Sequence, residues 1–144
     1  MQTFPPYPSF ERSAKVLDYR RLGKQRVEAW QIYLALFDPD YGWQNHPAVK
    51  MWRGYELALA WYGLYMCDEW KYRGYKDTMS DKFHKVIEAY PGDATRFFYA
   101  VPPWVGNRKF HKSHKSNLLR KDKAYYSKFF KNVPDNLPYE WPVQ

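Results

Sequence analysis

The placement of proline is the feature that most limits how this chain can fold, because proline interrupts helix interiors and sheet ladders alike. Three prolines lie within residues 1–10, Pro102 and Pro103 are adjacent, and three more lie within residues 132–144. Much of the chain between these places carries apolar residues at three- and four-residue steps, which align them on one face of a helix. The sequence therefore predicts helices joined by proline-rich connections.

Two helices are expected in the first third of the chain. Ser9 is a candidate cap for a short helix, and a long helix should follow over residues 17–37. On the long helix, Gln25 and Glu28 should lie with the cations on a polar face. The residues expected on its buried face are Leu22, Ala29, Trp30, Tyr33 and Phe37.

A second long helix is expected from Asn45, a candidate cap, to Gly74, a residue type that commonly ends helices. Pro47 suits the first turn, where a missing N–H costs nothing. We expect one uninterrupted helix over this range. Its expected buried stripe is Val49, Trp52, Tyr55 or Glu56, Leu59, Tyr62 or Gly63, and Met66.

The second half of the chain adds two shorter helices, over residues 77–90, closed by the sequence PGD, and over residues 114–130. The proline pair falls in a loop between them, and residues 132–144 should form an extended strap. No strand pattern and no repeat stands out. The predicted fold class is all-α: one compact helical domain over residues 1–144 with long Pro-rich connections and an extended C-terminal tail.

The charge and aromatic content favour an anionic partner. The formal net charge is +8, and 21% of the residues are aromatic. Cations and rings suit nucleic acid, since cations meet phosphates while rings stack on bases. A membrane surface is the second candidate for a basic chain. The plain alternative is an aromatic-rich core under a basic surface that only aids solubility.

Cysteine use and hydropathy point to the cytoplasm. Cys67 is the only cysteine, so no disulfide can form within the chain, and it is expected to be a core residue rather than a nucleophile. No apolar run approaches the roughly 18 residues of a membrane span. The first ten residues lack the pattern of a signal peptide. We expect a cytoplasmic monomer that does not associate with membranes.

Two histidine motifs have competing interpretations. His111 and His114 are spaced for one helix face, which can bind a metal, but Lys112 and Lys115 disfavour a divalent ion. Phosphate contact or structural capping is the better interpretation, and no metal site is expected. In the sequence NHP, Asn45 and His46 either start a helix or take part in function.

The sequence LLRKDKAYYSKFFK alternates cations with paired aromatic residues. Tyr125, Tyr126, Phe129 and Phe130 cannot all face the same core. At least one pair should meet solvent or a ligand, where stacking contributes roughly 1–3 kcal/mol per base. The alternative is that all four hold down the C-terminal tail.

Glu28 follows four cations that crowd into residues 20–26. Lys24 and Glu28 have the less favourable order for a helical ion pair, so stability does not require the glutamate. A carboxylate in a DNA-facing groove would repel phosphate, a cost that chemistry could justify. Glu28 is therefore either a solvated helix glutamate or a catalyst placed within a basic surface.

The ordered segments MQTF, YPSF, LDYRRLGKQRVEA, GWQNHPAVKMW, RGY and LLRKDKAYY resemble the pyrimidine-dimer DNA glycosylase family, in particular its bacterial branch. The resemblance spans nearly the whole chain, and it is the order of the motifs that carries it. It implies a compact α-helical fold and a DNA glycosylase that also cleaves abasic sites. It also implies that neither a metal nor an organic cofactor is needed.

In such enzymes the α-amino terminus attacks C1′ of the damaged nucleotide, the base leaves, and a helix glutamate assists the β-elimination that nicks the strand. By this resemblance the catalytic residues would be Met1, which we expect to be retained because Gln2 is bulky, and Glu28. The target would be DNA, in duplex form with base extrusion. The expected nucleic-acid-binding residues are Arg20, Arg21, Lys24, Arg26, Asn45, His46, His111, His114, Lys115, Arg120, Tyr125 and Tyr126.

One departure leaves the substrate open. The best-known family member has an arginine directly before the glutamate, but that position is Val27 here, and Arg26 lies about 100° further around the helix. The target could be another modified base, or a base in a single strand or in RNA. The rival functions are a non-catalytic module that binds distorted or single-stranded nucleic acid, and a helical protein–protein adaptor.

Overall fold

The computed structural model describes residues 4–90 and 99–142. This part of the chain contains seven helices and no strand. The all-α prediction is thus confirmed for this part. The sequence PGD at residues 91–93, predicted to close a helix, lies outside it.

The first two helices follow the predicted pattern. α1 (Phe10–Val16) begins after Ser9, whose hydroxyl accepts a hydrogen bond from the Arg12 N–H, as a helix cap does. α2 (Tyr19–Phe37) follows after a two-residue corner. Residues 4–9 before α1 are not helical, in keeping with their prolines.

The buried face of α2 differs from the predicted face. Its buried residues are Leu22, Gln25, Glu28, Ala29, Ile32 and Ala35. Trp30 and Tyr33 are only partly buried and Phe37 is exposed, because this flank packs against a short helix rather than the centre of the fold. Gln25 and Glu28 were predicted to lie with the cations on a polar face but are buried, so of the two interpretations of Glu28 the solvated helix glutamate is wrong.

The second long helix is interrupted. α3 (Pro47–Trp52) and α4 (Glu56–Tyr72) are separated by a turn in which Gly54 has φ +90°, a left-handed conformation that favours glycine. The prediction of one continuous helix is wrong at this point. Gly74, also left-handed, follows the end of α4 as predicted.

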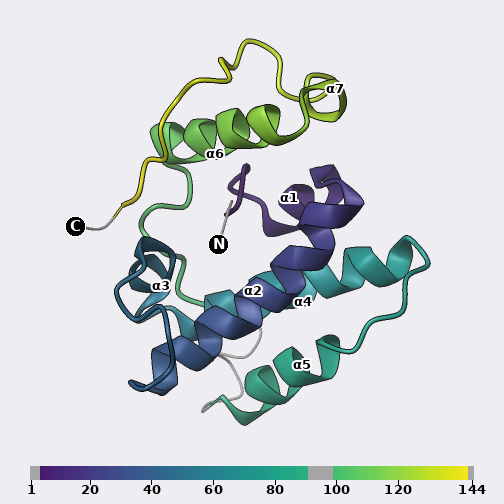
Figure 1. Ribbon diagram of the computed structural model, residues 1–144. Helices are drawn as coiled ribbons and strands as arrows, with labels where there is room; N and C mark the ends of the chain where they lie inside the picture. Colours follow the sequence, from purple (N-terminus) through teal and green to yellow (C-terminus); the bar gives the residue numbers. More distant parts are fainter. Residues whose placement is uncertain (1–3, 91–98, 143–144) are drawn as a thin grey trace.

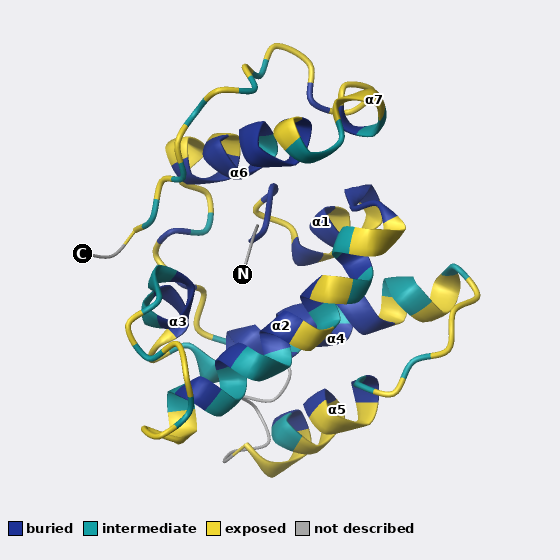
Figure 2. Ribbon diagram, in the orientation of Figure 1, coloured by how far each residue is buried: buried dark blue, intermediate teal, exposed yellow. Residues whose placement is uncertain are grey.

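α4 lies at the centre of the molecule, in contact with α1, α2 and α5 (Ser80–Ala89) (Figure 1). It is covered on several sides, so its buried residues do not form a single stripe (Figure 2). Gly63 allows the closest approach, since an added Cβ would lie 2.3 Å from the Phe83 ring of α5. Cys67 is fully buried here, as predicted, and burial raises the pKa of its thiol.

The last predicted helix begins earlier and is divided in two. α6 (Arg108–Lys121) starts after Asn107, whose side chain accepts a hydrogen bond from the Phe110 N–H. α7 (Lys123–Tyr126) is separated from it by Asp122, which has a non-helical conformation and caps α7 through the Tyr125 N–H. The helix predicted over residues 114–130 thus starts six residues after the observed start at Arg108, and the prediction lacks the break at Asp122.

Both ends of the chain meet α6. The N-terminal segment runs between α6 and the α1–α2 corner, and the C-terminal tail returns along α6 from α7 (Figure 1). The N–H groups of Leu137 and Glu140 donate to the hydroxyls of Ser116 and Ser113, each at 3.0 Å. The predicted extended strap is confirmed over the described part of the tail.

Candidate active site

Glu28 is buried on α2, with 3% of its surface exposed. A carboxylate in this position is costly unless charges or hydrogen bonds compensate it. Its charge reaches two partners on other helices: it raises the pKa of Tyr62, after burial, and it opposes the lowering of the Lys121 pKa. The charge of Glu28 is therefore felt both by a buried hydroxyl of α4 and by a cation at the end of α6.

A second polar residue on the same face connects Glu28 to the N-terminal segment. The Tyr62 hydroxyl donates a hydrogen bond to Gln25 Oε1, and Gln25 lies one turn before Glu28. The ring of Phe4 packs on Tyr62, with the ring centroids 5.7 Å apart. The residue that begins the described chain thus lies next to the buried polar group that adjoins Glu28.

Met1, the predicted nucleophile, lies outside the described residues. Covalent geometry still limits it, since three residues span at most about 11 Å. An amine at Met1 therefore stays within that distance of Phe4. The pairing of this amine with Glu28 stays a prediction.

Two histidines of α6 hold the N-terminal segment. The Phe4 N–H donates to His114 Nδ1 at 3.1 Å, and His111 Nδ1 lies 2.8 Å from the Pro5 carbonyl oxygen. Both rings are buried, which leaves neither free to meet a phosphate. Of the interpretations drawn from sequence, a structural role fits, and the expected nucleic-acid contact does not.

Metal binding is also disfavoured at these histidines. His111 uses both ring nitrogens for backbone groups, since its Nε2 accepts from the Gly106 N–H at 2.9 Å. Over residues 4–90 and 99–142, no three His, Cys, Asp or Glu side chains gather as a metal site requires.

Four cations line a cavity of about 260 Å³ beside the start of α2: Arg20, Arg21, Lys24 and Lys121. No acidic residue lines this cavity. Burial, reinforced by Arg21 and Lys24, lowers the pKa of Lys121. Such a concentration of positive charge suits a phosphate.

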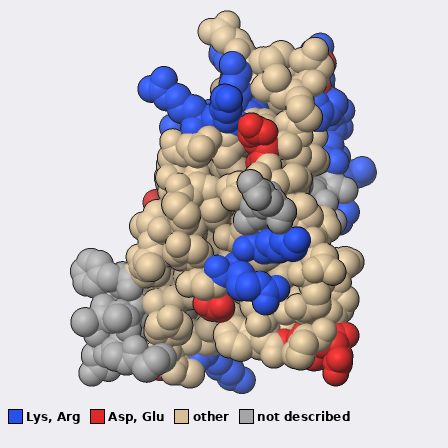
Figure 3. All heavy atoms as spheres, turned by 90° about the vertical axis from the view of Figure 1, so that its left-hand side faces the viewer, with Lys and Arg blue, Asp and Glu red and all other residues tan. Residues whose placement is uncertain are grey.

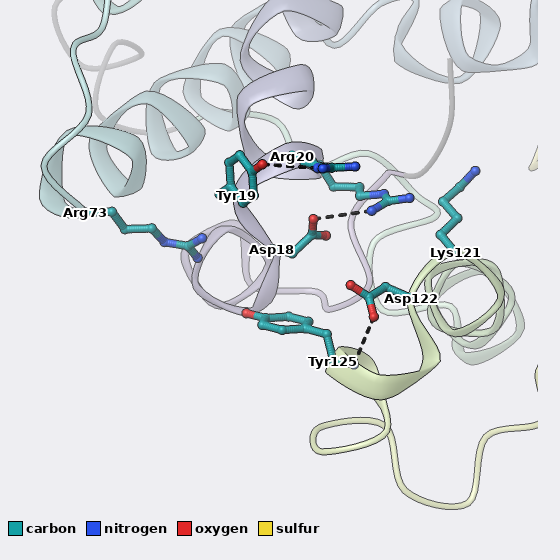
Figure 4. Close-up of a pocket in the computed structure, with 8 residues that line it drawn as sticks. Asp18, Tyr19, Arg20, Arg73, Lys121, Asp122 and Tyr125 are labelled. Atoms are coloured by element: carbon teal, nitrogen blue, oxygen red, sulfur yellow. Dashed lines mark hydrogen bonds and ion pairs between the residues drawn. The ribbon is translucent and has the colours of Figure 1, made fainter.

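A wider cavity of about 490 Å³ adjoins the four-cation cavity and shares Arg20, Arg21 and Lys121 with it. The corner between α1 and α2 faces the corner between α6 and α7 across it (Figure 4). Tyr125 reaches in from α7 and Arg73 from the end of α4. The two cavities form one groove, called the basic groove, in which five cations outnumber the two carboxylates Asp18 and Asp122 and Tyr125 adds an aromatic edge.

The side chains of this groove are partly held in place. The Arg20 guanidinium donates to the Tyr19 hydroxyl at 3.2 Å, and Arg21 pairs with Asp18 at 3.4 Å. Asp18 is itself held by Tyr126, whose hydroxyl donates to the carboxylate and accepts the Asp18 N–H at 3.0 Å. Cations that are already positioned lose less freedom when an anion binds.

Arg26 lies elsewhere. It forms an ion pair with Asp77 and lies over the Trp70 ring, 4.4 Å from its centroid. Its side chain is 12% exposed and does not line the basic groove. The expectation that Arg26 holds a phosphate therefore does not fit its position, and the ion pair gives it a structural role.

The C-terminal aromatic residues divide into an inner and an outer pair. Tyr126 and Phe130 are buried and stacked, with their ring planes 2° apart. Tyr125 is half-buried at the groove, and Phe129 beside it is exposed. The prediction that one pair meets solvent is confirmed, but Tyr126 is a core residue and cannot stack on a base.

At the start of α3, the cap is His46 rather than Asn45. His46 Nδ1 accepts from the Ala48 N–H at 3.0 Å, and its ring packs edge-on against Trp141 of the tail. Burial lowers the pKa of His46. Asn45 is exposed and caps nothing, which corrects the predicted order.

Two more predicted contacts have partners within the chain. Lys115 lies over the Tyr7 ring, 4.6 Å from its centroid, and burial lowers its pKa. Arg120 donates to the Asp135 carbonyl oxygen at 2.7 Å and so holds the tail. Neither lines the groove.

Five groove residues were missed from sequence: Asp18, Tyr19, Arg73, Lys121 and Asp122. Because Asp122 is a cap residue, the sequence could have indicated that a helix ends at Lys121. It could not indicate that this helix end approaches α2, since that is a tertiary contact.

Elsewhere on the surface, Lys and Arg gather towards the α6 end and near the middle of the face drawn in Figure 3. No helix in the described part of the chain is long and apolar enough to cross a membrane.

Comparison with known families gives one match. A family model described as pyrimidine dimer DNA glycosylase covers residues 1–83, more than half of the chain. This range contains Glu28, Phe4 and the α2 side of the basic groove. No curated protein and no solved structure matches the chain.

Proposed function

The chain belongs to the pyrimidine dimer DNA glycosylase family, and from this membership we propose that it removes a damaged or modified base from DNA and then cleaves the abasic strand. Pyrimidine dimers are the first candidate substrate. The catalytic groups are the α-amine of Met1 and the carboxylate of Glu28.

The reaction proceeds in two stages. The neutral amine attacks C1′, the N–C1′ bond forms as the glycosidic bond breaks, and the base leaves with a proton. The ring oxygen–C1′ bond then breaks, O4′ takes a proton from water, and the nitrogen lone pair forms the C=N bond of a protonated imine. Removal of a C2′ proton expels the 3′ phosphate, and water releases the cleaved strand. An α-amine with an ordinary pKa of about 7.7–8.0 is partly neutral at pH 7, which suits the first step.

Glu28 has two roles in this scheme. Its negative charge stabilises the cationic sugar and the imine, and its oxygen accepts protons during elimination. Burial supports both roles, because a charge interacts more strongly where water is excluded. The observation that carries the proposal is this buried carboxylate, which adjoins a basic groove and the anchored N-terminal segment.

The basic groove supplies the DNA contacts. Arg20, Arg21, Lys24 and Lys121 bind backbone phosphates, and Tyr125 offers a ring at the groove edge to an unstacked base. Phosphate contacts of this kind position the strand without reading its sequence. The lesion is therefore selected by how readily it leaves the helix.

Borohydride trapping tests the proposal, using protein with an untagged N-terminus. The substrates are UV-irradiated duplex, abasic duplex, and undamaged controls in single- and double-stranded form. We expect a covalent adduct that maps to Met1. An added N-terminal residue should lower its yield, because the amine is then displaced.

Glu28→Gln is the matching variant, with Glu88→Gln on exposed α5 as the control. General acid–base catalysis typically contributes about 10²–10⁴-fold, so Glu28→Gln should lose strand cleavage by that factor while DNA affinity is kept. Normal cleavage by Glu28→Gln would remove its catalytic role. Binding without any adduct on any substrate would favour a non-catalytic module for distorted or single-stranded nucleic acid.

A further inference from the structure

The two buried histidines of α6 are the only histidines among the described residues whose rings bond to the N-terminal backbone. They hold consecutive residues, Phe4 and Pro5, from one side. Neither ring belongs to the groove or adjoins Glu28 in the contacts above. Their role must be sought in the segment they hold.

The hydrogen bonds fix opposite tautomers for the two rings. His114 accepts the Phe4 N–H at Nδ1, so its proton lies on Nε2. His111 accepts the Gly106 N–H at Nε2, so its proton lies on Nδ1 and is donated to the Pro5 carbonyl. His114 must stay neutral to hold Phe4, because a protonated Nδ1 cannot accept, and His111 must stay neutral to accept the Gly106 N–H.

The segment that they hold is stiff. Pro5 and Pro6 have restricted φ angles and no N–H, so few other hydrogen bonds can fix this backbone. The Phe4 ring is wedged against Tyr62 and also contacts Trp52, with ring centroids 6.3 Å apart. An attachment at Phe4 therefore limits the direction in which the three preceding residues leave.

Packing alone does not require a histidine at position 114. The ring is completely buried against Phe110 and Trp141, and its Nε2 has no hydrogen-bond partner among the described residues. An unpaired buried N–H destabilises the fold, and an apolar side chain would avoid that loss. The ring nitrogen that does bond, Nδ1, is the one that holds Phe4.

We propose that His114 and His111 are positioning residues that set where the N-terminal amine meets the sugar and Glu28. This inference rests on the proposed function, in which that amine is the nucleophile. Positioning matters at this step because a displacement of about 1 Å can cost 10²-fold in rate. The histidines act through the backbone of Phe4 and Pro5 and do not touch the substrate.

Two amide variants at position 114 test the attachment. In His114→Asn the side-chain oxygen can take the place of Nδ1 and accept from the Phe4 N–H. In His114→Gln the amide is one carbon longer and reaches the Nε2 position instead. The variants share polarity and chemistry and differ in reach, so they form a matched pair. His114→Leu adds a variant without any acceptor.

The first readout is the single-turnover rate of borohydride trapping on abasic duplex, measured with the DNA dissociation constant. We expect His114→Gln and His114→Leu to lose at least tenfold in rate with affinity within twofold, and His114→Asn to stay within threefold of the parent. Circular dichroism melts at the assay temperature establish that each variant is folded. Equal trapping by the Asn and Gln variants would overturn the proposal.

The second readout needs no DNA. An acylating reagent near pH 7 labels the α-amine, and mass spectrometry follows the rate at Met1. We expect the labelling rates of His114→Gln and His114→Asn to differ at least threefold, because the attachment of Phe4 is lost in one variant and kept in the other. Equal labelling rates in the two variants would overturn the proposal that His114 anchors the N-terminal segment. If no protein traps DNA but the labelling rates still differ, the anchor stands and the proposed glycosylase function fails.

Discussion

Lowering the pH should destabilise the protein through His114 by an amount that follows from its burial. Burial lowers the pKa of this ring from 6.5 to about 3. Below pH 6.5 the unfolded chain takes up a proton that the folded chain refuses until about pH 3. The unfolded state then binds more protons, so the free energy of unfolding falls as the pH falls through this window.

The size of the effect is about 1.36 kcal/mol per pH unit. Between pH 6.5 and 4.5, His114 alone should therefore remove about 2.7 kcal/mol, and over the whole window about 4.8 kcal/mol. These amounts are a large share of the 5–15 kcal/mol that is typical of a domain. Acid sensitivity should begin well above the range in which carboxylates are protonated.

Urea unfolding at pH 7.5, 6.5, 5.5 and 4.5 measures the effect, with His114→Asn as the reference protein. Carboxylates and other histidines titrate in both proteins, so they cancel in the difference between the two. Whatever Asn costs at pH 7.5, the difference should move by about 2.7 kcal/mol in favour of the variant by pH 4.5. Parallel stability curves would refute the argument and show that His114 titrates normally.

Three further changes have expected outcomes. Gly63→Ala should destabilise the protein by about 1–3 kcal/mol in thermal unfolding, because the new Cβ would lie 2.3 Å from Phe83 and overpack the core. Gly63→Ala with Phe83→Leu should recover part of that loss, and no recovery would contradict the steric cause. Lys121→Gln should lower the dependence of DNA affinity on salt by about one phosphate contact, seen as a shallower slope of log affinity against log salt. Arg26→Met should leave that slope unchanged but destabilise the fold by about 3–5 kcal/mol in urea unfolding, because the buried Asp77 carboxylate loses its partner. A changed slope for Arg26→Met would return this residue to the DNA contacts.

The helices that could be predicted are those with local signals. Ser9 and Gly74 mark the start of α1 and the end of α4 through hydrogen bonding and φ requirements that belong to the residue itself. Gly54 carries the same kind of signal, but an apolar pattern continues past it. The turn interrupts the helix there, with Gly54 in a left-handed conformation, and periodicity does not reveal it.

The buried face of α2 shows the limit of pattern reasoning most clearly. Leu22, Ala29 and Phe37 satisfy the helical period, yet Phe37 is exposed while Gln25 is buried. Gln25 can be buried because the Tyr62 hydroxyl of α4 donates to it. Because Tyr62 lies on another helix, no residue spacing within α2 indicates this partner. From the sequence, only the polarity of Gln25 was available, and it favoured the polar face.

The residues of the candidate site also divide into those with a local sequence signal and those brought together by tertiary contacts. Glu28 and the α2 cations were found because they crowd into one helix, and the family model covers that helix. Lys121 joins them only when α6 packs beside α2. The ion pair of Arg26 with Asp77 joins residues 51 positions apart, and no local pattern shows it. Which tyrosine of the pair 125–126 faces the groove likewise depends on Asp18, which holds Tyr126 inside.

Under the proposed function, the burial of Glu28 explains how a carboxylate can coexist with phosphate binding. A glutamate on the groove surface would repel the strand, but the four-cation cavity has no acidic lining, Asp18 and Asp122 line only the wider cavity, and Glu28 is buried. Glu28 therefore lowers the stability of the fold, because its carboxylate is buried. It does not lower the affinity for DNA, as a carboxylate on the groove surface would through repulsion of phosphate. Since the strand meets the cations first, replacing Glu28 by glutamine should change affinity little and cleavage greatly. A base extruded from the strand, and not the phosphates that hold it, would bring the sugar within reach of this carboxylate.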